Sequence, residues 1–222
     1  GGFFGHVSQS AVISMSVNQS LIDARLSLAA LSAGGFIGFG EQVEISQSDN
    51  SGSVRGLTET GGFVGTAGTV TISTSVNTAE VIGGVQADGI TGTQVAGLVG
   101  IAVQAYIFQS VNLGSISVWG STAGGLIGQA TRLSVEQSQN AGVITVRDGG
   151  TAGLVGRVNF LSVKNAYNSG QVVANANLGG LASRVINAAQ LENSYNIGVL
   201  SQSPQWSVSQ GIGRWLTPSV TD

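Results

Sequence analysis

The sequence predicts an all-β protein folded as a parallel β-helix, or β-solenoid, with about seven right-handed coils of 27–35 residues and three short strands per coil. Three observations predict it. One phrase of about 28 residues is written seven times along the 222-residue chain, apolar and polar residues alternate within each copy, and glycine and asparagine recur at fixed places. A fixed period of 20–50 residues is typical of units that bury their apolar faces only by stacking on neighbours.

Two landmarks define each copy. A glycine followed by two apolar residues opens it, and an asparagine in the phrase Ser/Ala-x-Asn-x-Gly/small-x-apolar follows 15 or 16 residues later. From the asparagine to the next glycine the distance varies between 12 and 20 residues, which predicts that insertions lie on one side of the stack. The landmarks are Gly2, Gly35, Gly62, Gly97, Gly125, Gly153 and Gly180, and Asn18, Asn50, Asn77, Asn112, Asn140, Asn168 and Asn196.

Three strand positions follow one another in each copy. The first is the apolar pair after the glycine, such as Phe63 and Val64. The second contains apolar residues eight and ten positions after the glycine, such as Val70 and Ile72, with the polar Thr71 between them. The third is the Val or Ile after Asn-x-Gly. Period-2 alternation predicts half-buried strands, and the Gly, Asn and Ser residues between them favour turns.

Parallel stacking places each residue above its equivalent in the next copy. The asparagines then form an inward ladder, in which each amide donates to the side-chain carbonyl of the next one and to local backbone. Antiparallel hairpins would favour two-residue Asn-Gly or Asp-Gly loops, and the repeat has Asn-x-Gly instead. The only glycosylation sequon, Asn18-Gln19-Ser20, uses a ladder asparagine, so we expect no modification there. Glu136 and Lys164 share one outward position, which predicts an exposed ion pair.

The repeats divide the chain into a solenoid over residues 1–203 and a tail over residues 204–222. The repeats start near residues 1, 34, 61, 96, 124, 152 and 179. The tail breaks the period and contains both prolines. Two interpretations stay open: a cap over the last coil, or a degenerate eighth coil opened by Gly211-Ile212-Gly213. Because Gly1 already lies inside the repeat phrase, we expect the chain to be part of a longer protein.

The glycine phrases carry a resemblance to a known family. Gly-Leu-Val-Gly at Gly97–Gly100 and Gly153–Gly156, with variants such as Gly62–Gly65, resembles the GLUG motif. That repeat occurs in surface and secreted proteins of bacteria and some protists, including adhesin-like proteins and non-catalytic stretches of IgA-cleaving peptidases. The resemblance covers residues 1 to about 200, although Gly180–Ser183 lacks the closing glycine. It implies an extracellular or cell-surface location and a stalk or adhesive role, with no catalytic residue to transfer.

Composition excludes several function classes. Only 9% of residues are charged and the net charge is -3, so the chain offers no basic surface for nucleic acid. Without cysteine it has neither disulfides nor thiolate metal sites. No apolar run reaches 18 residues, so we expect no membrane span.

We expect no catalytic, cofactor-binding or metal-binding residues, and therefore no enzyme. His6 is the single histidine, too few for a multi-histidine metal site. Glu41 and Glu44 are the closest pair of acids, and exposed charge on a strand explains them. Gly83–Asp88 lacks the third glycine of the calcium-binding nonapeptide repeat, so we expect no calcium site.

Three functions stay open. The first is a rigid stalk or adhesin that contacts a host or neighbouring cell surface, through a glycan or protein ligand, at the inserted connections 19–34 and 78–96. A short helix could form there over Leu21–Ser32. The second is a self-associating subunit of an extracellular filament or sheath. The third is a polysaccharide-degrading β-helix enzyme, for which the dispersed acids offer no active-site cluster.

Overall fold

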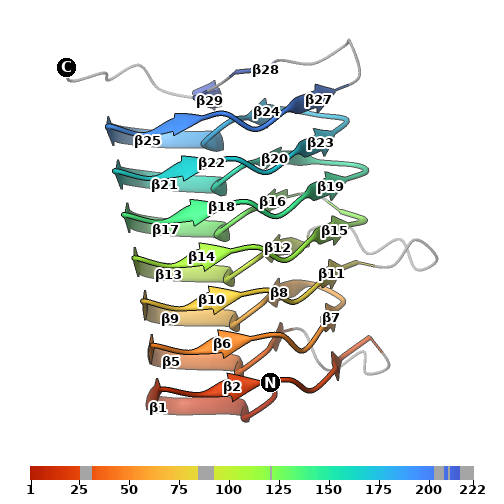
Figure 1. The fold of residues 1–222 in the computed structure, drawn as a ribbon, viewed down its shortest axis with the longest axis vertical. Helices are drawn as coiled ribbons and strands as arrows, with labels where there is room; N and C mark the ends of the chain where they lie inside the picture. The colour runs from red at the N-terminus through yellow and green to blue at the C-terminus, as the bar shows by residue number, and fades with distance from the viewer. Residues whose placement is uncertain (26–31, 85–92, 121, 203–207, 210, 216–222) are drawn as a thin grey trace.

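The coils are stacked along one axis into a rod (Figure 1). The structure is a computed structural model that describes residues 1–25, 32–84, 93–120, 122–202, 208–209 and 211–215. Every strand pair is parallel, and the described residues contain no helix. From β1 (Phe4–Ser14) to β25 (Ala182–Glu192) the chain makes about six turns. The predicted all-β parallel solenoid is therefore confirmed.

Four sheets run along the rod, and each coil contributes one strand to each of them. We name them the long sheet, the asparagine sheet, the third sheet and the fourth sheet. The long sheet contains β1, β5 (Ile37–Ser46), β9 (Val64–Ser73), β13 (Val99–Phe108), β17 (Ile127–Glu136), β21 (Val155–Lys164), β25 and β29 (Ile212–Trp215). The asparagine sheet contains β2 (Val17–Asn18), β6 (Asp49–Asn50), β10 (Val76–Asn77), β14 (Val111–Asn112), β18 (Gln139–Asn140), β22 (Tyr167–Asn168) and β26 (Tyr195–Asn196).

The third and fourth sheets follow the asparagine in each coil. The third sheet contains β3 (Ile22–Asp23), β7 (Val54–Gly56), β11 (Val81–Gly83), β15 (Ile116–Val118), β19 (Ile144–Val146), β23 (Val172–Ala174) and β27 (Leu200–Gln202). The fourth sheet contains β4 (Ser32–Gly34), β8 (Glu59–Gly61), β12 (Gln94–Ala96), β16 (Thr122–Gly124), β20 (Gly150–Ala152), β24 (Leu178–Gly179) and β28 (Val208–Ser209).

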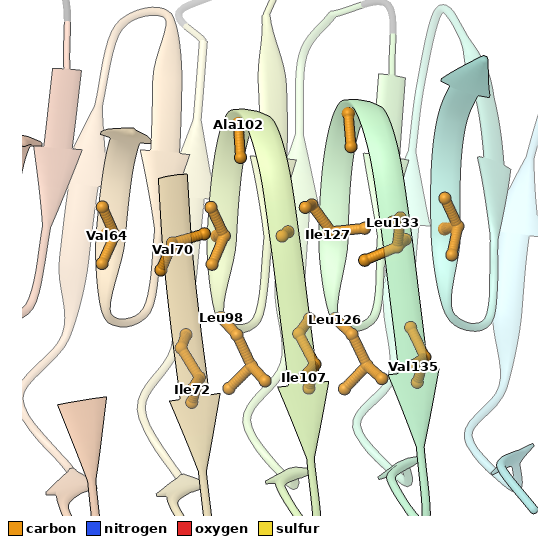
Figure 2. Packing of buried hydrophobic residues seen from close by; sticks show 14 of the residues in the cluster. Val64, Val70, Ile72, Leu98, Ala102, Ile107, Leu126, Ile127, Leu133 and Val135 are labelled. Atoms are coloured by element: carbon orange, nitrogen blue, oxygen red, sulfur yellow. The ribbon is translucent and has the colours of Figure 1, made fainter. Parts of the chain in front are cut away.

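The expectation of three short strands per coil needs correction, because the structure has four. The first two predicted strands belong to one long strand, which arches at Ala102 in β13 (Figure 2). The strand at the asparagine and the one just before the landmark glycine were not predicted. Each has two or three residues, which is too short for a periodicity, and pairing with the neighbouring coils defines it.

Rows of identical or similar apolar side chains fill the interior (Figure 2). Val70 and Ile72 are fully buried while Thr71 between them is half-buried, and the same alternation holds in the neighbouring coils, so the predicted period-2 pattern is confirmed. Leu98 stacks in line with Leu126, and both are inaccessible to solvent. Burial of one such side chain stabilises the fold by roughly 1.5–3 kcal/mol.

The two sequence landmarks face each other across the coil. A Cβ atom added to Gly62 would come within 2.7 Å of the Asn77 side chain and would also overlap the Gly97 carbonyl oxygen. The next copy repeats this arrangement with Gly97 and Asn112. Glycine is required at this position because the asparagine side chain occupies the space that a Cβ atom would need. This contact also explains why the number of residues between the two landmarks varies so little.

The expected asparagine ladder is confirmed. Each Nδ2 donates to the Oδ1 of the next asparagine, at 2.6–2.8 Å for all six bonds from Asn18 to Asn196. Nδ2 also donates to the backbone carbonyl two residues on, as from Asn77 to Ala79 at 3.1 Å. Asn18 of the sequon is 3% exposed and bonded into this ladder.

A second ladder runs beside the first, two residues before each asparagine. The serine Oγ accepts a hydrogen bond from the backbone N–H of the equivalent residue in the preceding coil. It also donates a hydrogen bond to the backbone carbonyl two residues earlier in its own coil. Ser138, for example, accepts from the Ser110 N–H and donates to the Glu136 carbonyl. Ala166 interrupts this serine ladder, so Ser138 N–H lacks the acceptor that its equivalents have. The ladder serines are Ser16, Ser48, Ser75, Ser110, Ser138 and Ser194.

One residue before the serine ladder, each coil turns through a left-handed backbone conformation. The φ angles lie between 46° and 52°, a region that non-glycine residues adopt rarely and β-branched ones at a cost. Thr74 is the β-branched member of this set. These corner residues are Met15, Gln47, Thr74, Gln109, Gln137, Asn165 and Asn193.

Two local expectations differ from the structure. The helix over Leu21–Ser32 is wrong in its described part, since Ile22–Asp23 is a strand that pairs with β7. Residues 26–31 lie outside the described residues. Glu136 and Lys164 are register partners as expected, but the lysine forms its ion pair with Glu192 of the following coil, at 3.3 Å.

The last copy and the tail extend the same sheets. The extra residue of the last copy causes a register shift between β21 and β25, beyond Val158. In the tail, β28 pairs with β24, and β29 pairs with β25 through Ile212 and Ala182. Pro204 and Pro218 lie outside the described residues.

Candidate functional site

The described residues hold no group of three or more His, Cys, Asp or Glu side chains that could bind a metal ion. His6 stacks on the Phe39 ring at 4.8 Å. Glu41 and Glu44 are exposed on β5. Of the calcium-like stretch Gly83–Asp88, residues 85–88 lie outside the described residues. Two other surfaces differ from the plain repeat, one at the insertions and one on the long sheet.

Both inserted connections join the third sheet to the fourth, so they leave the rod at the same corner, which we call the insertion corner. The first is residues 24–31, between β3 and β4, and the second is residues 84–93, between β11 and β12. In the coil between them, residues 57–58 alone connect the third sheet to the fourth. The predicted ranges 19–34 and 78–96 were too wide, because each includes two strands of the solenoid.

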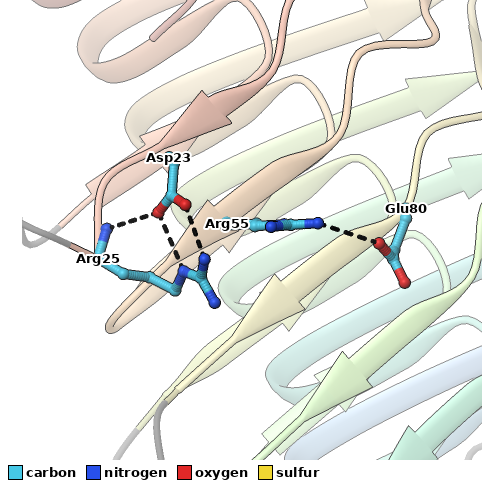
Figure 3. A network of polar contacts seen from close by, with 4 residues as sticks. All are labelled: Asp23, Arg25, Arg55 and Glu80. Carbon is cyan, nitrogen blue, oxygen red and sulfur yellow. Dashed lines mark hydrogen bonds and ion pairs between the residues drawn. The ribbon is translucent and has the colours of Figure 1, made fainter.

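Charged side chains line the start of the insertion corner (Figure 3). The Arg25 side chain donates to Asp23 from Nε at 3.0 Å and from Nη2 at 2.7 Å, and its backbone N–H donates at 3.1 Å. These hydrogen bonds, the side-chain ones above all, lower the pKa of Asp23 to about 2. They also raise the pKa of Arg25.

Arg55 on the next coil extends this row of charges. It is the register partner of Asp23, and its Nη2 lies 4.0 Å from Glu80 Oε2, one coil further on (Figure 3). The Arg55 Nε is buried and finds no hydrogen-bond partner in the described part of the chain. Half-exposed pairs of this kind contribute under about 1 kcal/mol each. The Asp23–Arg25 and Arg55–Glu80 ion pairs lie near the start of the two insertions, and their arrangement is that of structural ion pairs.

A groove of about 820 Å³ lies on the outer face of the long sheet, across β13, β17, β21 and β25. Two half-buried serines, Ser134 and Ser162, are register partners at its floor. Tyr106 precedes them in the same row and Gln190 follows them. Both of these longer side chains are exposed and line the groove, so this row marks a trough that runs along the rod axis from Tyr106 to Gln190.

The flanks of the groove carry an aromatic ring and charges. On one side the Arg132 guanidinium lies over the Phe160 ring, 5.4 Å from its centroid. No carboxylate of the described residues forms an ion pair with Arg132. On the other side Lys164 is paired with Glu192. No repeat pattern marks this groove, because most of its lining residues occupy outward positions that vary from copy to copy, as Arg132 and Phe160 do.

A second arginine lies over an aromatic ring on a different side of the rod. The Arg147 guanidinium is 3.6 Å from the centroid of the Trp119 ring, beyond the ends of β19 and β15. This pair lies outside the long-sheet groove.

The chain matches no family model, no curated protein and no solved structure. Within the described residues, no helix is long and apolar enough to cross a membrane.

Proposed function

We propose that this chain is a non-catalytic, rigid segment of an extracellular or cell-surface protein, which acts as a stalk or adhesin as the GLUG-like phrases imply. The observation that carries the proposal is the unbroken ladder from Asn18 to Asn196, which couples seven coils through buried hydrogen bonds. In repeat proteins stability is the sum of such neighbour interactions, and stacked coils give length along one axis. A scaffold of this kind separates a binding surface from its anchor.

The insertion corner is the contact surface in this proposal. Both insertions join the third sheet to the fourth, with a single plain coil between them, so they start and end at the same corner of the rod. Loops on a rigid scaffold carry recognition more often than the scaffold itself. The partner is a glycan or protein on a host or neighbouring cell surface.

Exchange of the insertions tests the proposal. Residues 24–31 and 84–93 are each replaced by residues 147–149, which join the same two sheets in a plain coil. Binding of the labelled chain to intact bacterial and animal cells is measured by flow cytometry. We expect the exchanged variants to lose binding while circular dichroism still reports the β-solenoid. Undiminished binding of the double exchange to cells would refute the role of the insertion corner.

A subunit of an extracellular filament or sheath is the second candidate. On the first coil Val12 and Val17 are exposed apolar side chains. Exposed apolar surface favours contact with another chain. Light scattering at micromolar concentration distinguishes the candidates, because a filament subunit grows with concentration and a stalk segment stays monomeric.

A further inference from the structure

We propose that the long-sheet groove binds a segment of an acidic oligosaccharide, a glycan chain that bears a carboxylate. This site is distinct from the insertion corner and does not rest on the function proposed above. The groove is formed by strands of four consecutive coils, so its shape is fixed by the core of the solenoid and not by a loop.

The floor of the groove suits the hydroxyl groups of a sugar. Ser134 and Ser162 lie directly above one another, and each hydroxyl can both donate and accept a hydrogen bond. From Tyr106 to Gln190 the trough spans three coil spacings, or roughly 14 Å at ~4.8 Å per coil. That length accommodates several linked sugar rings in an extended chain.

The flank supplies an apolar face and a positive charge. Phe160 on the flank and Tyr106 at one end of the trough are 43% and 48% exposed, which leaves apolar surface for the C–H faces of sugar rings. The Arg132 guanidinium has no ion-pair partner in the described part of the chain, and it is held near the groove by the Phe160 ring. A guanidinium binds a carboxylate through two parallel hydrogen bonds. Glu192 also lines the groove, but its carboxylate is paired with Lys164 at 3.3 Å, so the charge that lacks an ion-pair partner is that of Arg132. This charge favours a uronic or sialic acid over a neutral sugar.

The sheet face favours a glycan over a peptide. A peptide that adds to a sheet needs free backbone N–H and C=O groups at an edge. The groove lies instead on the face of β17 and β21, whose backbone groups pair with strands on both sides. The ligand must therefore bind through side chains that are spaced by the coil repeat, and a chain of hydroxylated rings matches that pattern.

The experiment measures binding of the intact chain to an array of immobilised oligosaccharides. The array carries uronic-acid and sialic-acid glycans beside neutral glycans of equal length, together with an acidic peptide of matched charge. Arg132→Gln removes the cation, Phe160→Ala removes the platform, and Ser162→Tyr fills the trough. Arg147→Gln is the matched control, because it removes an arginine from an aromatic ring outside the groove.

We expect acidic glycans to bind and neutral ones to bind at least about tenfold more weakly, as expected for loss of a charge-assisted contact. Arg132→Gln and Phe160→Ala should each weaken binding about tenfold, Ser162→Tyr should abolish it, and Arg147→Gln should leave it unchanged. Thermal melts confirm that each variant is folded. Absence of binding to every acidic glycan would overturn the proposal, as would equal binding of neutral glycans or of the acidic peptide. A chain with exchanged insertions should keep this binding, so loss of binding in that chain would place the site at the insertion corner instead.

Discussion

Substitution of Asn140 by leucine tests whether the asparagine ladder stabilises the solenoid. Leucine has the same number of side-chain heavy atoms and the same branching, so it retains the shape that packs on Gly125. It loses three hydrogen bonds: the one accepted from Asn112 at 2.7 Å, and those donated to Asn168 at 2.8 Å and to the Gly142 carbonyl at 3.0 Å. The buried Asn112 amide, Asn168 side-chain carbonyl and Gly142 backbone carbonyl then each lose the hydrogen bond that they form with Asn140.

The magnitude follows from these three unsatisfied groups. Each buried polar group that loses its partner costs about 1–3 kcal/mol, and the added apolar burial of leucine returns about 2 kcal/mol. We therefore expect Asn140→Leu to lower the free energy of unfolding by about 4 kcal/mol, the middle of a range of about 1–7 kcal/mol. The matched control is Asn196→Leu at the last ladder position, which is only half-buried, accepts one ladder bond from Asn168 and donates to the Gly198 carbonyl at 2.9 Å. We expect it to cost about 1 kcal/mol.

Guanidinium unfolding followed by far-UV circular dichroism measures both variants. If the ladder couples neighbouring coils, Asn140→Leu should lower the midpoint and also the slope of the transition, because the two halves of the rod then unfold less cooperatively. A change within about 0.5 kcal/mol, or equal costs at Asn140 and Asn196, would refute the reasoning.

Four further predictions concern stability. Ala166→Ser should complete the serine ladder and raise the free energy of unfolding by about 1 kcal/mol, and a lower guanidinium midpoint would contradict this. Thr74→Asn should raise it by about 1 kcal/mol, measured in the same way, because asparagine tolerates the left-handed corner better than a β-branched residue. Thr60→Val should raise the melting temperature, since the buried Thr60 hydroxyl has no hydrogen-bond partner among the described residues and Val95 already fills the equivalent place one coil on. The lowered pKa of Asp23 means that its ion pair contributes stability above pH ~4, and that this is lost as the pH falls through about 2. Asp23→Asn should therefore destabilise by less than about 1 kcal/mol at pH 7 and have no effect below pH 2, as pH-dependent unfolding would show.

The repeat made the main features of the fold predictable. Period and alternation identified the parallel coil and its core, and the conserved distance between landmarks reflects the contact of glycine with asparagine, as at Gly62 and Asn77. The short strands at the asparagine and before the glycine depend on neighbouring coils, so no local pattern shows them. Register also depends on insertions: the extra residue of β25 accompanies the pairing of Lys164 with Glu192.

The two candidate surfaces were predictable to different extents. Unequal spacing between copies located the insertions, although not their limits. The long-sheet groove depends on which outward residues become neighbours across coils, as Arg132 and Phe160 do. These neighbours can be identified only when the strand register is known, and the repeat pattern does not identify them.

The asparagine ladder also gives the rod a direction. In all six bonds the amide nitrogen belongs to the earlier coil and the carbonyl oxygen to the later one, so the side-chain dipoles point the same way along the axis. Aligned hydrogen bonds polarise one another, and reversal of one member would place two donors or two acceptors face to face. The two ends are therefore chemically unlike: a coil added after Asn196 must present an acceptor, and one added before Asn18 must present a donor. Whether coils are added by gene duplication or by contact between molecules, the ladder permits them to join head to tail and opposes joining head to head.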